Sequence, residues 1–337
     1  MPAEAILYEK LEGGALRCLL CAHYCRIISG RKGICGVREN RGGTLYSLVY
    51  GKVVAENVDP IEKKPLYHFQ PGSLSYSIAT VGCNLSCSHC QNYQISKEAV
   101  KGITIPGNPR TPEAIVSSAL DTGCRSVSYT YTEPTIFMEF ARDCAQLASR
   151  AGLANIFVTN GFLSPEARDV ACGFLDAANI DLKAATQEHY RQVCGASLQP
   201  VLDTIEELHG RGVWIEVTTL LIPGLNDDID SLQFIASFIA SLDTSIPWHI
   251  SRFFPAYKML DRPPTPIPSM RKAEQVGRQA GLKHVYLGNV RSETEITSCG
   301  NCGHPLIERS GYSVREMRVT DAGKCPACGT AFDGVLP

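Results

Sequence analysis

The sequence VGCNLSCSHCQN (residues 81–92) places Cys83, Cys87 and Cys90 in a C-x₃-C-x₂-C spacing directly after an apolar, alternating segment. A closed structural metal site takes four protein ligands, and this segment has three cysteines. Soft thiolates also bind iron–sulfur clusters, which ordinarily take four cysteines. Three cysteines would therefore leave one iron of a [4Fe–4S] cluster open to another ligand. A zinc loop with a distant fourth ligand is the alternative interpretation.

Around this loop the chain alternates between expected strands and expected helices. The expected strands cover residues 75–81, 126–132, 155–160, 177–183, 213–222, 248–254 and 284–289. The expected helices cover residues 112–121, 134–151, 164–174, 199–210, 229–242 and 269–280. Such alternation indicates βαβ units and a parallel sheet. No G-x-G-x-x-G follows a strand, which argues against a dinucleotide-binding fold. We therefore predict an α/β fold, a partial (β/α)6 TIM-type barrel, over residues 73–295.

Polar residues follow successive strands of this predicted barrel. They are Cys83, Glu133, Asn160, Lys183, Asn226 and Tyr257. Chemistry in such barrels is concentrated at the carboxyl ends of the strands. We therefore expect these side chains to surround one site that includes the three-cysteine loop.

Two smaller cysteine-rich modules are predicted on either side of the barrel, over residues 1–72 and 296–337. In the first, the alternating residues 44–58 predict a hairpin. In the second, two C-x₂-C pairs predict a tetrahedral metal site, and zinc is favoured over iron. The metal would stabilise this small C-terminal segment. Its ligands would be Cys299, Cys302, Cys325 and Cys328.

The N-terminal set consists of Cys18, Cys21, Cys25 and Cys35. Four thiolates with this spacing predict either zinc or an auxiliary iron–sulfur cluster, and the spacing does not decide between them. The small, polar segment slightly favours zinc as a structural staple. The remaining four cysteines of the 15, Cys124, Cys144, Cys172 and Cys194, are expected to be buried apolar residues.

Composition narrows the class of protein. The 337 residues are 44% hydrophobic and 20% charged, which is typical of a globular protein, and the net charge of −2 gives no strong signal for nucleic-acid binding. No apolar segment predicts a signal peptide or a membrane span. Many cysteines without a secretion signal favour metal or catalytic thiolates over disulfides. We therefore expect a cytoplasmic protein without membrane contact.

The three-cysteine loop after the first barrel strand resembles the signature of the radical S-adenosylmethionine (SAM) enzymes. Within them, the chain is similar to the pyruvate formate-lyase activating enzyme group. More narrowly it resembles the AmmeMemoRadiSam-system radical SAM proteins, in residues 59–92 and 247–259. The resemblance implies that the open iron binds the amino and carboxylate groups of SAM. An electron then cleaves the sulfonium C–S bond, and the resulting 5′-deoxyadenosyl radical abstracts hydrogen from a substrate.

The resemblance also implies SAM contacts in the first half of the barrel. His89 occupies the position, usually aromatic, that lies near the adenine, and Asn92 matches a common asparagine after the loop. Thr132 and Glu133 correspond to a segment that holds the SAM amino group, although both glycines of that segment are replaced here. Taken alone, Glu133 before Pro134 would be read as a charge at a helix N-terminus.

Further matches lie in later strands. Asn160 belongs to a TNG segment, and Asp181 and Lys183 belong to a DLK segment in which the lysine would pair with the SAM carboxylate. Val158 replaces an acidic residue that often helps to bind a monovalent cation, so the sequence does not decide whether that cation site exists. Tyr257 falls where activating enzymes often have a SAM-contacting histidine.

The predicted function is therefore reductive SAM cleavage at a [4Fe–4S] cluster. The expected partners are SAM, an electron donor such as flavodoxin or ferredoxin, and a protein substrate of the glycyl-radical type. Radical modification of a small molecule or RNA is the catalytic alternative. The second alternative is a non-catalytic, metal-binding adaptor. The presence of all three cluster cysteines, together with Glu133 and Lys183, argues against this alternative.

Overall fold

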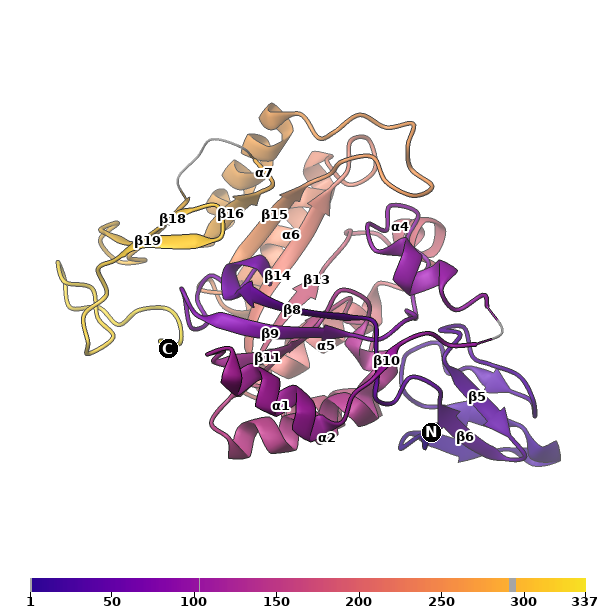
Figure 1. The fold of residues 1–337 in the computed structure, drawn as a ribbon. Coiled ribbons are helices and arrows are strands. Elements are labelled where there is room, and N and C mark those ends of the chain that lie inside the picture. Colours follow the sequence, from indigo (N-terminus) through magenta and orange to yellow (C-terminus); the bar gives the residue numbers. More distant parts are fainter. Residues whose placement is uncertain (1, 103, 291–294) are drawn as a thin grey trace.

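The computed structural model of the chain describes residues 2–102, 104–290 and 295–337, and it is built around one eight-stranded sheet (Figure 1). The strand order is β16-β15-β14-β13-β12-β11-β9-β8, in which β8 runs antiparallel to β9 and all other neighbours are parallel. The strands are β8 (Ala55–Pro60), β9 (Leu74–Ala79), β11 (Ser126–Tyr129), β12 (Ala154–Thr159), β13 (Ala177–Asp181), β14 (Trp214–Leu221), β15 (Trp248–Arg252) and β16 (Val285–Gly288). In these described residues the sheet is open, with β16 and β8 as its edges, which confirms the predicted α/β fold with a parallel sheet.

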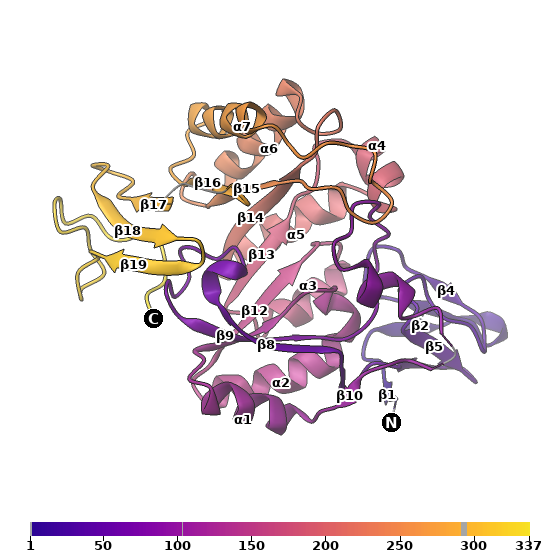
Figure 2. The same ribbon diagram turned by 45° about the horizontal axis from the view of Figure 1, so that its top comes forward.

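Helices connect the parallel strands on the outside of the sheet (Figure 2). They are α1 (Pro112–Asp121), α2 (Met138–Arg150), α3 (Pro165–Cys172), α4 (Gln187–His189), α5 (Gln199–Gly210), α6 (Ile229–Leu242) and α7 (Ile267–Gln279). The same connections contain the 3₁₀-helix η4 (Pro134–Phe137) and the π-helices η3 (Gln94–Glu98) and η5 (Tyr190–Cys194). Two further 3₁₀-helices, η1 (Glu12–Gly14) and η2 (Ile61–Lys63), precede the first parallel strand. Thr111 and Ser164 cap α1 and α3 by accepting hydrogen bonds from the backbone N–H groups of Ala114 and Ala167, at 3.2 and 3.1 Å. This confirms that a hydroxyl followed by proline marks a helix start.

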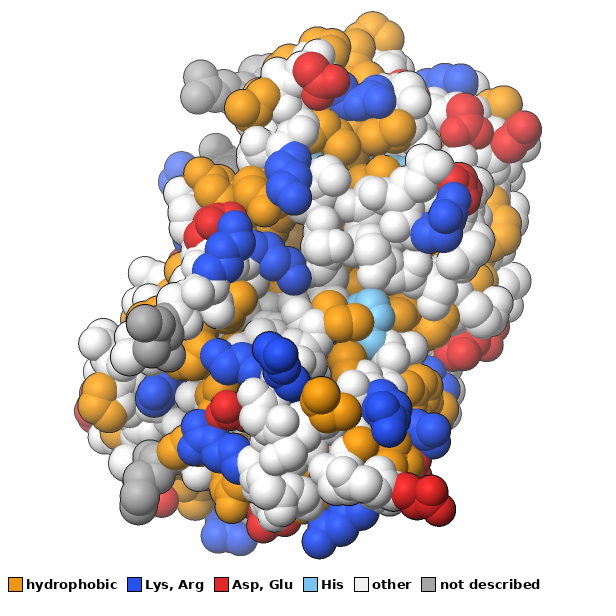
Figure 3. All heavy atoms as spheres, turned by 90° about the vertical axis from the view of Figure 1, so that its right-hand side faces the viewer, with side chains coloured by type: hydrophobic (Ala, Val, Ile, Leu, Met, Phe, Trp, Pro, Cys, Tyr) orange, Lys and Arg blue, Asp and Glu red, His pale blue; other side chains and the backbone are white. Residues whose placement is uncertain are grey.

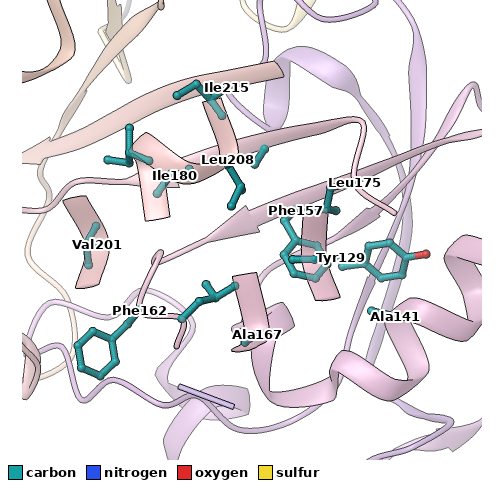
Figure 4. Packing of buried hydrophobic residues seen from close by; sticks show 14 of the residues in the cluster. Tyr129, Ala141, Phe157, Phe162, Ala167, Leu175, Ile180, Val201, Leu208 and Ile215 are labelled. Atoms are coloured by element: carbon teal, nitrogen blue, oxygen red, sulfur yellow. The ribbon is translucent and has the colours of Figure 1, made fainter. Parts of the chain in front are cut away.

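The main core lies between the sheet and these helices (Figure 4). Tyr129 of β11 and Phe157 of β12 are both fully buried, and their ring centroids are 5.7 Å apart in an edge-to-face arrangement. Ala141 of α2 presents a small side chain at this place, so the helix can approach the aromatic pair. Burial of such side chains from consecutive βα units holds the carboxyl ends of the strands at one edge of the sheet.

The predicted hairpin over residues 44–58 is wrong. These residues form β6 (Thr44–Ser47), β7 (Lys52–Val53) and the start of β8, which enter three different sheets: β6 pairs with β1 (Ala3–Glu4) and β5 (Arg38–Arg41), β7 with β10 (Asn108–Pro109), and β8 with β9. Alternation of apolar and polar residues identifies a strand but not its partner, because any sheet with one buried face produces the same pattern. The main sheet therefore begins at β8, within the segment expected to belong to the first module.

Small sheets occupy the two ends of the molecule in Figures 1 and 2. At the N-terminal end, β1, β6 and β5 form one sheet, and β2 (Tyr8–Lys10), β3 (Leu16–Cys18) and β4 (Arg26–Ile27) form another. At the C-terminal end, β17 (Glu295–Ser298), β18 (Pro305–Ser310) and β19 (Ser313–Met317) form an antiparallel sheet. In the described parts of the chain, no helix combines the length and apolar character needed to cross a membrane.

The four C-terminal cysteines gather beside this last sheet. Cys299, Cys302, Cys325 and Cys328 are the one group of three or more potential ligands, among the described residues, whose donor atoms all lie within 4.8 Å of one another. The sulfur of Cys299 is 3.7 Å from that of Cys328, and the sulfur of Cys302 is 3.7 Å from that of Cys325. A tetrahedron with metal–sulfur bonds of about 2.3 Å has edges of about 3.8 Å, so the spacing suits a single tetrahedral metal ion.

Arg309 of β18 connects the C-terminal sheet to the barrel. Its fully buried guanidinium group donates hydrogen bonds to the carbonyl oxygen of Tyr67 at 2.6 Å and to Oγ1 of Thr297 at 2.8 Å, and it lies 3.5 Å from the carboxylate of Glu62. It also lies over the ring of Tyr67, 4.5 Å from the centroid. Burial makes the ion pair costly to break, because the remaining carboxylate would be left without a countercharge.

We expect Arg309→Ala to lower the free energy of unfolding by about 3–5 kcal/mol, since it leaves Glu62 buried and unpaired. Urea denaturation would measure the change. The exposed Arg315 on β19 offers the matched control, and Arg315→Ala should stay within about 0.5 kcal/mol of the unaltered protein. Equal stability of the two variants would show that Arg309 does not hold the C-terminal sheet in place.

Candidate active site at the carboxyl ends of the strands

A cavity of 1680 Å³ opens at the carboxyl ends of the sheet strands. Its wall includes residues that follow β9, β11, β12 and β13, and others from β14, β15 and β16. The basic residues among them are Lys63, Lys64, Lys183 and Arg252. Figure 3 views the molecule from the right-hand side of Figure 1, and several blue Lys and Arg side chains gather toward the middle of that face.

The predicted cluster loop lies against this cavity, and Cys83, Cys87 and Cys90 all line it. The backbone fixes their positions: the N–H groups of Ser86 and Ser88 donate to the carbonyl oxygens of Cys194 and Val193 in η5, at 2.8 and 3.0 Å. Both carbonyls belong to this π-helix, a distortion that is common at functional sites. The loop is therefore anchored along its length while its sulfurs remain accessible from the cavity.

Gly82 makes the entry to the loop possible. Its φ of +101° lies in a region that side chains avoid, and a Cβ atom here would lie 2.8 Å from Val37 and 2.9 Å from Ile136. Its N–H donates to the carbonyl oxygen of Ile95 at 2.9 Å. The turn before Cys83 therefore depends on glycine for both conformation and space.

The donor set fits an iron–sulfur cluster with one open iron. Three thiols share one cavity, but their sulfurs are not gathered at the spacing of a single ion within the described residues. Cys194, expected to be an ordinary buried cysteine, adjoins Cys87, and a hydrogen bond between the two thiols lowers the pKa of Cys87 to about 7, aided by the charge of Lys183 and opposed by burial. Cys194 is fully buried and lies outside the described cavity lining, unlike the three cysteines of the loop.

His89 lies in the cavity wall as a neutral ring. Burial, together with the nearby charge of Lys183, lowers its pKa to about 3, so the imidazole is uncharged at neutral pH. Within the described structure its Nδ1 is buried and has no hydrogen-bond partner. Asn92, predicted beside it, also lines the cavity, and its amide donates to the carbonyl oxygen of Tyr131 at 2.7 Å.

Glu133 has a different place from the one predicted. It is fully buried, lies outside the cavity lining, and accepts hydrogen bonds from the hydroxyls of Thr135 and Thr159 at 2.6 and 2.7 Å and from the backbone N–H groups of Thr135 and Asn160 at 3.1 and 2.8 Å. Burial raises its pKa, and these donors oppose that shift. The carboxylate therefore ties the end of β11 to the end of β12 and caps η4, which agrees with the helix-charge interpretation.

Asp181 ends β13, Lys183 follows it, and both line the cavity. Nζ of Lys183 lies 2.8 Å from Oδ2 of Asp181. Burial would lower the lysine pKa, but the charge of Asp181 and the nearby Cys87 outweigh it and raise the pKa well above its usual value. The backbone N–H of Lys183 donates to the hydroxyl oxygen of Tyr190 at 3.0 Å, which orients this part of the chain. The site thus holds a permanently charged ammonium group.

The other predicted residues divide between the cavity and its support. Thr132 and Asn160 line the cavity; Thr132 donates to the carbonyl oxygen of Thr80 at 2.8 Å, and the Asn160 amide donates to Oδ1 of Asn84 at 2.8 Å. Asn226 and Tyr257 are outside the described lining. Asn226 binds the backbone of its own turn and the carbonyl oxygen of Lys183 at 2.7 Å, and Tyr257 stacks on Tyr93 with centroids 4.6 Å apart.

The sequence interpretation missed polar residues in the cavity wall beside β8. Lys64 donates to Asp59 at 2.6 Å, and Asp59 also accepts from the hydroxyl of Tyr131. Nε2 of His249 lies 2.6 Å from the carboxylate of the buried Glu216, so this histidine is satisfied by a partner in the core. The only signal in the sequence was the charged run at residues 62–64, which is also typical of a surface segment.

Comparison with known proteins agrees with this geometry. The family model described as "Radical SAM superfamily" matches residues 77–235. An uncharacterized protein of Methanocaldococcus jannaschii, MJ0808, is 43% identical over 336 residues and covers 99% of both chains. Pyruvate formate-lyase 1-activating enzyme of Escherichia coli is 23% identical over 165 residues, 47% of this chain and 65% of that enzyme.

Among solved structures, a radical SAM methyltransferase from Sphaerobacter thermophilus has a similar fold, with a TM-score of 0.51 and 16% identity over 66% of this chain and 68% of that one. This likeness concerns the fold alone. The family match covers the end of β9, the three-cysteine loop and strands β11 to β14, while the cavity wall from β15 onward lies outside it. Residues 77–235 therefore form a domain that matches the radical SAM superfamily model, and the chain as a whole belongs to one family with MJ0808.

Proposed function

We propose that this protein is a radical SAM enzyme that reductively cleaves SAM to start a radical reaction on a substrate bound in the same cavity. The observation that carries the proposal is the convergence of three cavity-lining thiols, the ammonium group of Lys183 and the neutral ring of His89 on one space. When bound to the three cysteines, a [4Fe–4S] cluster would supply the electron that cleaves SAM. The protein's own task is to hold SAM and to exclude water.

Each residue has a task that follows from its surroundings. Lys183 has three N–H donors and uses one on Asp181, so it can also bind the carboxylate of SAM. The uncharged His89 ring, with its free Nδ1, suits stacking against adenine and one hydrogen bond to it. Glu133 is a positioning residue, because it acts through Thr159 and the backbone of Asn160. Asn92 and Thr132 supply polar groups on the wall beside the loop.

The size of the cavity supports a substrate larger than a small metabolite. Pockets for drug-sized ligands measure about 300–1,000 Å³, whereas this cavity measures 1680 Å³. The excess leaves room for part of a second molecule beside SAM. We propose a protein segment, as in glycyl-radical activation, in line with the likeness to an enzyme named for activating pyruvate formate-lyase. A flavodoxin or ferredoxin would supply the electron, and modification of a small molecule or RNA is the second candidate.

The direct test is anaerobic reconstitution with iron and sulfide, followed by incubation with SAM and dithionite. We expect 5′-deoxyadenosine to form, and we expect Cys87→Ala to abolish it because the cluster loses a ligand. Cys172→Ala, at a partly buried cysteine on α3, is the matched control and should retain the activity. If Cys87→Ala still forms 5′-deoxyadenosine, the assignment of Cys87 as a cluster ligand is wrong. If the unaltered protein forms no 5′-deoxyadenosine, the non-catalytic adaptor is favoured.

Lys183 can be tested by binding. We expect Lys183→Met to weaken SAM binding by about 10- to 100-fold, the equivalent of one charge-assisted hydrogen bond of about 1.5–3 kcal/mol, while iron content stays constant. Isothermal titration calorimetry on the reconstituted protein measures this. The control is Lys101→Met, because Lys101 is exposed, lies outside the cavity lining and contacts Glu98. Unchanged affinity in Lys183→Met would contradict the role of this lysine.

The substrate class can be tested separately. Electron paramagnetic resonance of the active protein with a candidate glycyl-radical partner should show a glycyl radical on that partner. If 5′-deoxyadenosine forms but no protein radical appears with any such partner, a small-molecule or RNA substrate is favoured. The SAM-cleavage proposal would stand in that case.

We also propose zinc as the metal of the C-terminal cysteine group, since its sulfur spacing suits a tetrahedral ion. The purified protein should contain about one zinc per chain at this site, and Cys325→Ser should lose that zinc and unfold at a lower temperature. Metal analysis and calorimetry measure both changes, with Cys172→Ser as the control. Iron in place of zinc, or zinc retained by Cys325→Ser, would contradict the assignment.

A further inference from the structure

The four N-terminal cysteines surround a second, smaller cavity. Cys18 ends β3, and Cys21, Cys25 and Cys35 lie in the loops around β4. The remaining wall is mainly apolar, and it is formed by Leu20, His23, Ile27, Gly33, Ile34, Arg38, Asn84 and Ile136. An apolar wall with four thiols is a site that a sulfur-rich cofactor can fill.

The spacing of these thiols differs from that of the C-terminal group. In the described structure, no three of the N-terminal cysteine sulfurs lie within 4.8 Å of one another, whereas all four C-terminal sulfurs do. The three sulfurs of the cluster loop share the wider arrangement. A single ion needs sulfur–sulfur distances of about 3.8 Å, whereas a cluster places several metal atoms between its ligands. The N-terminal set therefore matches the cluster loop and not the zinc-type site.

Arg38 provides an independent observation. Its side chain is 1% exposed and lines this cavity. Nη2 donates to Glu139 at 2.6 Å, but Nε and Nη1 are buried and have no hydrogen-bond partner in the part of the chain that the structure describes. Buried N–H donors without acceptors are destabilising, and the sulfur atoms of an anionic cluster would accept hydrogen bonds from them.

The cavity also shares a wall with the cluster loop. A Cβ atom on Gly82 would lie 3.0 Å from the carbonyl oxygen of Cys35, and Nε2 of His23 lies 2.8 Å from the carbonyl oxygen of Asn84. Asn84 directly follows Cys83 in the chain. No described residue lines both this cavity and the large one, so the N-terminal site lies behind the loop and outside the proposed SAM site.

We propose that Cys18, Cys21, Cys25 and Cys35 hold a second iron–sulfur cluster, with Arg38 donating hydrogen bonds to it. The position behind the loop suits one-electron exchange with the first cluster and keeps the second away from a substrate in the large cavity. The site assignment rests on the N-terminal residues alone. Its role in electron exchange rests on the proposed function. The sequence slightly favours zinc at this site, and the sulfur spacing and the unpartnered donors of Arg38 reverse that preference.

The test removes the first cluster and leaves the second site intact. In the full chain with Cys83→Ala, Cys87→Ala and Cys90→Ala, we expect anaerobic reconstitution to load about four irons and about four sulfides. Reduction should then give the electron paramagnetic resonance signal of a reduced iron–sulfur cluster. A triple variant without iron and sulfide, or one that holds about two zinc ions per chain, would overturn the proposal.

A second comparison assigns the iron to these residues. Adding Cys18→Ala and Cys35→Ala to the triple variant should remove the remaining iron, whereas adding Cys172→Ala should not. Retained zinc at the C-terminal group and an unchanged circular dichroism spectrum would show that the fold persists. Iron that stays after the loss of Cys18 and Cys35 would place the cluster elsewhere and overturn the assignment. These outcomes do not depend on SAM cleavage, so they can fail separately from the proposed function.

Discussion

The hydrogen bonds that hold the loop at residues 83–90 are the constraint on which the site depends. The loop receives support from η5 through Ser86 and Ser88, and from the N-terminal module through His23. Gly82 allows the close approach of Val37 and Ile136 at the start of the loop. Segments from three parts of the chain therefore fix the positions of the three thiols, which form one wall of the cavity.

The charges of the site follow from that constraint. Glu133 is buried and accepts hydrogen bonds from four donors. It therefore holds the ends of β11 and β12 together and does not face the cavity. Lys183 keeps its proton in spite of burial because Asp181 lies beside it. The neutral His89 adds no positive charge next to this ammonium group. We propose that the Lys183 ammonium group binds a carboxylate and that the uncharged His89 ring stacks on a base.

Much of this arrangement could be predicted from the sequence. Strand and helix periodicity gave the seven parallel strands, and the caps Thr111 and Ser164 marked helix starts, because these signals are local. The spacing of Cys83, Cys87 and Cys90 indicated the cluster loop for the same reason. The partners of residues 44–58 could not be predicted, because pairing depends on distant segments. The place of Cys194 beside Cys87 and the buried bonds of Glu133 required the folded chain.

The two outer cysteine sets show the same limit. Their ligand number is evident from the sequence, but the distances between their sulfurs arise only after folding. In the C-terminal set, paired sulfur atoms lie 3.7 Å apart. In the N-terminal set, the sulfur atoms lie farther apart, around an apolar cavity that Arg38 also lines. We therefore propose that the three cysteine sets hold different groups: one metal ion, a closed cluster, and a cluster with a free position.

The central claim is that this free position belongs to SAM. Electron–nuclear double resonance of the reduced, reconstituted protein with SAM labelled by ¹⁵N in its amino group and ¹⁷O in its carboxylate measures it most directly. We expect hyperfine coupling from both labels to the cluster held by Cys83, Cys87 and Cys90. Absence of coupling from both labels, with SAM bound, would contradict it.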